Sequence, residues 1–109
     1  MNRETELALS ASIEHWRENE EAECFTKASV ESDDCALCAD FYHEDCQGCP
    51  VAQSTGRTWC RGTPYQAAAD ALDHWAYGEK EDAERHREEF RACAKREREF
   101  LESLLDEVL

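Results

Sequence analysis

Two Cys-x-x-Cys pairs lie close together in the middle of this chain, and they constrain its fold more than any other feature. The pairs are Cys35 with Cys38 and Cys46 with Cys49, and seven residues separate them. A Cys-x-x-Cys pair on a tight turn directs two sulfurs at one point, and two such pairs can surround Zn²⁺ with four thiolates at about 2.3 Å. Gly48, inside the second pair, suits the sharp turn that this arrangement requires. The spacing therefore predicts a metal site.

More side chains are available than a tetrahedral ion can bind. The preferred ligand set is Cys35, Cys38, Cys46 and Cys49. Cys60 could replace one cysteine of the second pair, and His43, which lies between the pairs, is a further substitute. An iron–sulfur cluster is the alternative to zinc, because Pro50 follows Cys49 as in iron–sulfur ligand runs, although the tight triple spacing of bacterial ferredoxins is missing. The expected cofactor is a structural Zn²⁺.

Disulfides fit this chain less well than a metal does. The seven cysteines are an odd number, which a closed disulfide framework does not accommodate. The first residues, MNRETELALS, lack the continuous apolar run of a secretion signal, and no segment has the apolar length of a membrane span. We therefore expect a cytoplasmic protein whose thiols remain reduced. Cys24 and Cys93 fall in helical patterns and are predicted to be buried as small apolar side chains.

A catalytic role for the metal or the thiols is not expected. The run His43-Glu44-Asp45-Cys46 differs from the H-x-E signature of zinc deaminases, because Glu44 is adjacent to His43 rather than two residues on. Metalloprotease, phosphate-loop and serine-hydrolase motifs are missing, and a thioredoxin-like pair would need a βαβ context. The sequence predicts a non-enzymatic protein with no catalytic residues.

Helical patterns flank the cysteines, so the expected fold is mainly α, with a single domain of residues 1–109. Its predicted parts are an N-terminal helix (1–29), a Cys-rich metal-binding region (30–62), a second helix (63–78) and a long C-terminal helix (79–109). The central region has little apolar content and cannot hold itself in a compact domain. Structural zinc contributes on the order of 10 kcal/mol in small finger peptides, which is enough to order it.

Local signals place the helices more closely. Thr63 can cap the second helix, Pro64 suits its first position, and Gly78 can end it. A further helical turn is expected to begin at Pro50. The N-terminal helix carries Leu9, Ile13 and Trp16 on one face. The motifs SIEHW (12–16) and ALDHW (71–75) resemble each other, and each Trp is predicted to anchor the core with its His at the edge.

The C-terminal helix has the clearest apolar stripe. Its members are Ala83, Phe90, Cys93, Ala94, Leu101, Leu104, Leu105 and Val108, with Glu97 on the same face. A long helix with one apolar stripe needs a partner. That partner is either the N-terminal helix of the same chain or a second copy, so a homodimer through this helix is one expectation.

The charge of the chain is strongly negative and uneven. The formal net charge is −14, and the first fifty residues contain thirteen acidic and three basic side chains, which leaves −10 there. Such a surface repels nucleic-acid phosphates, so direct nucleic-acid binding is not expected. It can instead attract a protein with a basic surface, including one built to hold nucleic acid.

The order SIEHW, C-x-L-C, C-x-G-C-P-V and T-G-x-x-x-C-x-G-T-P-Y resembles small uncharacterised proteins of bacteriophages and prophages. The resemblance covers most of the chain and centres on residues 12–16 and 35–65. It implies a viral or prophage origin and a zinc-binding module with flanking helices, and it carries over no catalytic residue. His43 is not part of the shared pattern.

The resulting hypothesis is a phage-type zinc protein that binds a basic host protein in the host cytosol, as an anti-defence inhibitor would. One alternative is a protein that sequesters a signalling nucleotide. Its binding residues would be Arg57, Trp59, Arg61 and Tyr65, which could stack a base and hold a phosphate. Another alternative is a structural zinc module of a larger complex.

Overall fold

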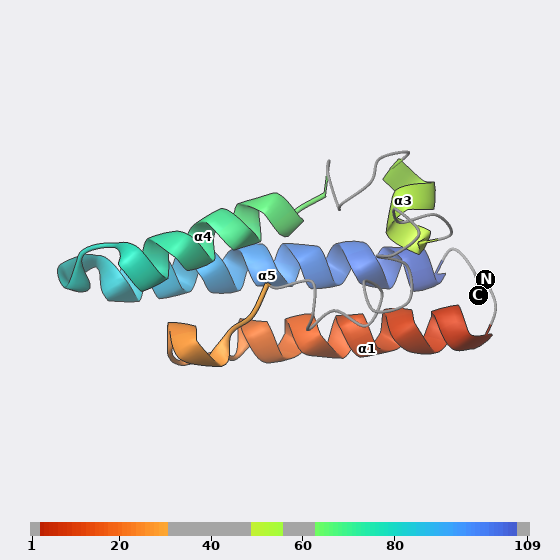
Figure 1. Cartoon of the computed structure of the whole chain (residues 1–109), viewed down its shortest axis with the longest axis horizontal. Coiled ribbons are helices and arrows are strands. Elements are labelled where there is room, and N and C mark those ends of the chain that lie inside the picture. Colours follow the sequence, from red (N-terminus) through yellow and green to blue (C-terminus); the bar gives the residue numbers. More distant parts are fainter. Residues whose placement is uncertain (1–2, 31–48, 56–62, 107–109) are drawn as a thin grey trace.

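The long helix α5, Ala83–Asp106, is the element against which the other helices pack (Figure 1). The computed structural model describes residues 3–30, 49–55 and 63–106. The other helices in these ranges are α1 (Arg3–Glu20), α3 (Pro50–Thr55) and α4 (Tyr65–Tyr77), with the 3-10 turns η1 (Phe25–Lys27) and η4 (Lys80–Asp82). These ranges contain no strand, so the predicted mainly helical fold with a long C-terminal helix is confirmed.

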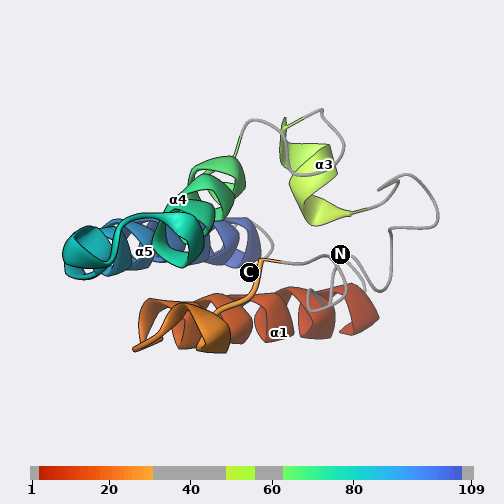
Figure 2. The same ribbon diagram turned by 60° about the vertical axis from the view of Figure 1, so that its left-hand side comes forward.

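A single apolar core runs along α5, which lies between α1 and α4 (Figures 1 and 2). Its largest contributions are Leu9, Ile13 and Trp16 from α1, Ala68, Ala71 and Trp75 from α4, and Phe90, Ala94, Leu101 and Leu104 from α5. Five members of the predicted stripe, Phe90, Cys93, Ala94, Leu101 and Leu104, are thus covered within the chain, and Val108 lies outside the described residues. A homodimer through this helix stays a prediction.

The start of α4 follows the sequence signals. The Tyr65 N–H donates a hydrogen bond to the Thr63 hydroxyl over 3.2 Å. Pro64 has a φ of −65°, the value that suits a first helical turn, and its carbonyl accepts the Ala68 N–H at 3.1 Å. The helical turn expected at Pro50 is also present as α3.

The far end of α4 closes at Gly78, whose N–H donates to the His74 carbonyl over 2.8 Å. The φ of Gly78 is −81°, so the left-handed conformation of many helix ends is not the reason for glycine here. Close approach is the reason. An added Cβ would lie 2.4 Å from the His74 carbonyl oxygen and 2.8 Å from His86 Nε2. The absent side chain lets α5 turn back tightly against α4.

Helix α1 ends at Glu20, well before the end of the predicted N-terminal helical segment, because tertiary contacts close it. The Arg91 guanidinium of α5 donates to the Glu20 carbonyl oxygen, which a longer helix would have used itself. Arg98 of α5 donates to the Glu20 carboxylate over 3.1 Å and to Glu102 over 2.7 Å. The hydrogen bond with Glu20, and then that with Glu102, raise the pKa of Arg98, so this link stays charged.

The two SIEHW-like motifs occupy matching places in the core. Trp16 and Trp75 are buried, and each preceding histidine lies at the edge, as predicted. His15 is half-buried, whereas His74 is exposed and lies beside His86 of α5. The tryptophans therefore act as core anchors.

Candidate metal centre and its surroundings

Most of the predicted metal ligands lie outside the described residues. These are Cys35, Cys38, Cys46 and the substitutes Cys60 and His43. Cys49 is described, and it is buried, with a relative exposure of 6 % immediately before α3. Within residues 3–30, 49–55 and 63–106 no group of three or more His, Cys, Asp or Glu side chains is placed to hold a metal ion. The tetrahedral site stays a prediction.

Cys49 is packed in the core of the described chain. Val51, two residues later, is also buried, and α3 packs against α5. Burial of this kind is also what a small core side chain would show. The role of Cys49 as a ligand stays a prediction, and a cation that it coordinated would deprotonate its thiol.

The segment that leads into the cysteine region is fixed firmly to α1. Asn19, with a relative exposure of 1 %, donates from Nδ2 to the Ser29 carbonyl over 2.9 Å and accepts the Ser29 N–H at 3.1 Å. His15 Nε2 lies 2.8 Å from the same carbonyl oxygen and donates to it. We call residues 28–30 the entry strap. Three hydrogen bonds to side chains of α1 hold it in place.

Tyr65 extends this attachment to α4. Its hydroxyl donates to the Val30 carbonyl over 2.7 Å, and its ring meets Trp16 edge-on with centroids 6.2 Å apart. The cysteine region therefore begins at a point where α1, α4 and the entry strap are joined. Within the region the chain returns to the core at Cys49 and Val51. These two anchored points bracket the preferred ligand set, which lowers the loop-closure entropy that a metal site between them must overcome.

The predicted nucleotide-binding residues are only partly described. Arg57, Trp59 and Arg61 lie outside the described ranges. Tyr65 is described, and its hydroxyl already donates its proton to the Val30 carbonyl, so it is not free to donate to a ligand. The structure thus gives Tyr65 a part in holding the frame, and the ligand-binding role stays a hypothesis.

The two cysteines predicted to be buried behave differently. Cys93 is buried in α5, with 8 % exposure, and its sulfur accepts a hydrogen bond from Arg96 at 3.3 Å. Cys24 is only half-buried, so that prediction is wrong: α1 has ended before it, and it immediately precedes η1. A hydrogen bond with Thr26, 3.1 Å away, lowers the pKa of the Cys24 thiol, and the charge of Lys27 lowers it further.

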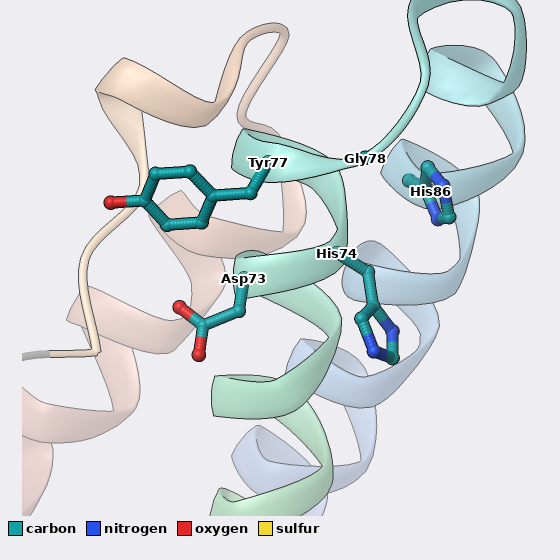
Figure 3. A pocket seen from close by; sticks show the side chains of 5 residues that line it. All are labelled: Asp73, His74, Tyr77, Gly78 and His86. Carbon is teal, nitrogen blue, oxygen red and sulfur yellow. The ribbon is translucent and has the colours of Figure 1, made fainter.

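A shallow depression of about 360 Å³ lies at the junction of α4 and α5, and sequence analysis did not predict it. Its lining is Asp73, His74, Tyr77, Gly78 and His86 (Figure 3). The imidazole centroids of His74 and His86 are 6.1 Å apart. The sequence did contain a signal for this depression. Gly78 ends α4, and a helix that turns back there must bring residues on either side of Gly78 together.

The described helices include none that combines the length and the apolar character of a membrane-spanning segment. Comparison of the chain with protein-family models, with curated proteins and with solved structures gave no match.

Proposed function

We propose that the protein is a non-enzymatic, zinc-stapled helical module that acts in a host cytosol by binding a host protein with a basic surface. A component that handles nucleic acid, such as part of a defence system, has the required surface. By covering that surface, the protein would inhibit the host component. This proposal joins the predicted zinc site, the phage-type sequence pattern and the distribution of charge over the helical frame.

The observation that carries the proposal is the unbalanced acidity at the end of α1. Residues 14–23 expose Glu14, Glu18, Glu21 and Glu23. Arg17 is the one Arg or Lys in this stretch, and it already pairs with Glu14 at 2.9 Å. Glu18, Glu21 and Glu23 form no ion pair with the described part of the chain. A concentrated negative surface of this kind steers and orients basic partners.

Arginines elsewhere in the frame are largely committed to internal pairs. The pairs are Arg17 with Glu102, Arg85 with Asp82, Arg87 with Glu84 and Glu88, and Arg98 with Glu20 and Glu102. The exposed pairs among these add little stability, but every pair neutralises charge locally. They do so on and around α5 and at Glu20, and they leave the carboxylates of Glu18, Glu21 and Glu23 available.

The proposal is tested with the full-length chain as bait in a nuclease-treated bacterial lysate, at low and moderate salt. The expected captured protein is released when double-stranded DNA is added, because bait and DNA would occupy the same basic surface. A matched bait carries Glu18→Gln, Glu21→Gln and Glu23→Gln, which keep the side-chain volumes and remove three charges. This bait should capture less of the same protein.

Two results would contradict the proposed function. One is the absence of any captured protein at either salt concentration. The other is a captured protein that resists DNA and binds the triple Gln variant equally well, because recognition would then not depend on the acidic surface.

A further inference from the structure

Two exposed aromatic side chains belong to the end of the molecule where both α1 and α4 end (Figure 1). Phe25 of η1 is 41 % exposed and Tyr77, the last residue of α4, is 86 % exposed. Leu7, on the first half of α1, is the other large hydrophobic side chain that the described ranges expose strongly. The η1 turn packs against α4, and Figure 3 shows Tyr77 extending from α4 toward the segment that follows α1.

Phe25 rests on a rigid base. The ring of Phe25 meets the ring of Trp75 edge-on, with centroids 6.4 Å apart. Trp75 is buried and packs in turn on Phe90 of α5, at a centroid distance of 5.9 Å. Phe25 is therefore held open to solvent by the core below it. An exposed aromatic side chain fixed in this way can contact a partner at little cost in conformational entropy.

A carboxylate accompanies Tyr77. Asp73 lies one helical turn earlier on α4, is exposed, and points to the same side as Tyr77, whereas His74 points toward α5 (Figure 3). Asp73 forms no ion pair with the described residues. Glu21 and Glu23 are exposed on the neighbouring segment before η1. We call the surface formed by Phe25, Tyr77, Asp73, Glu21 and Glu23 the aromatic–acidic end.

We infer that the aromatic–acidic end is the docking surface for an arginine-bearing segment of the basic partner, an inference that rests on the proposed function. A guanidinium is planar, stacks on an aromatic face and forks to a carboxylate, and an ammonium does not match both features. The Tyr77 ring and the Asp73 carboxylate, one turn apart, offer these two contacts side by side. Glu21 and Glu23 supply charge complementarity to further basic residues, and Phe25 supplies apolar contact.

The test uses the ¹⁵N-labelled full-length protein and two synthetic Gly/Ser peptides of equal length, one with four arginines and the other with four lysines. The amide resonances that the arginine peptide shifts should cluster around Tyr77, Asp73 and Phe25. Tyr77→Ala should weaken arginine-peptide binding about two- to five-fold, the range expected for an exposed cation–π contact. The lysine peptide should bind more weakly to the wild-type protein and lose less on this substitution.

Leu7→Ala is the matched control. It also removes an exposed hydrophobic side chain, but from the first half of α1, away from the aromatic–acidic end. Affinity for the arginine peptide should not change in this variant. If Tyr77→Ala and Leu7→Ala behave alike, or if the shifts spread evenly over the acidic face of α1, the docking surface is wrong while the proposed function stands. If neither peptide binds, the docking surface is wrong, and the capture from lysate decides the proposed function separately.

A second copy of the chain is the competing occupant. Spectra without peptide at two protein concentrations test it, and they should superimpose. Concentration-dependent shifts at Phe25 and Tyr77 would assign the surface to self-association and overturn the inference.

Discussion

Replacement of Asn19 by alanine is the sharpest test of how the cysteine region is attached to the helices. Asn19 is almost fully buried and makes two hydrogen bonds to the backbone of Ser29, of 2.9 and 3.1 Å. Each intramolecular hydrogen bond contributes about 1 kcal/mol net. Loss of the buried side-chain atoms leaves a small cavity that adds about 1 kcal/mol. The free energy of unfolding should therefore fall by about 2–3 kcal/mol.

The measurement is urea-induced unfolding at a fixed free zinc concentration, followed by circular dichroism at 222 nm. A loss of this size lowers the thermal midpoint of a domain of about 100 residues by on the order of 10–20 °C. Zinc affinity, measured by competition with a chromophoric chelator, should also fall, because the entry strap that Asn19 holds leads directly into the predicted ligands.

Gln66→Ala is the control for this substitution. Gln66 is an exposed amide whose hydrogen bond goes to Asp70, 3.0 Å away on the same helix, and its loss should change stability by less than about 0.5 kcal/mol. If Asn19→Ala matches this control in both stability and zinc affinity, the entry strap is not fixed in the way that we describe.

Three further outcomes are expected. Gly78→Ala should lower the free energy of unfolding in urea by about 1–3 kcal/mol. Addition of His86→Ala to this variant should not restore the stability, because the new methyl group first meets the backbone carbonyl of His74. Full rescue by His86→Ala would contradict this explanation. Because the pKa of Cys24 is lowered and Cys93 is buried, iodoacetamide should alkylate Cys24 faster than Cys93 at pH 7. Thr26→Val should move the pH midpoint of Cys24 alkylation upward. An unchanged midpoint would show that Thr26 is not the cause of the lowered pKa. Removal of zinc by a chelator should lower the thermal midpoint yet leave most of the helical signal, because the helices pack directly on one another; complete loss of helicity would show that the frame depends on the metal.

The helices that sequence analysis placed best are those whose local signals agree with their packing. Thr63, Pro64 and Gly78 bound α4 because a hydroxyl cap, a fixed φ and a missing Cβ act within a few residues of the sequence. The stripe of α5 was readable because one face of a long helix is covered along most of its length.

The end of α1 and the exposure of Cys24 were not readable in the same way. The end of α1 depends on a partner far away in the sequence, and the exposure of Cys24 follows because α1 has ended before it. Arg91 binds the carbonyl of Glu20, and Asn19 turns its side chain to the returning strap instead of to solvent. The pairing of His74 with His86 also requires the hairpin geometry at Gly78. The metal ligands are a separate case, because only Cys49 among them falls within the described ranges.

The central claim is that one ion gathers the cysteines between the entry strap and α4. X-ray absorption at the zinc edge, combined with elemental analysis of the purified full-length protein, tests it most directly. We expect one zinc per chain with a shell of sulfur at about 2.3 Å, and a loss of zinc when Cys35 and Cys38 are replaced by serine. Protein that contains no stoichiometric metal, and whose cooperative unfolding is unchanged by exhaustive chelation, would contradict the claim.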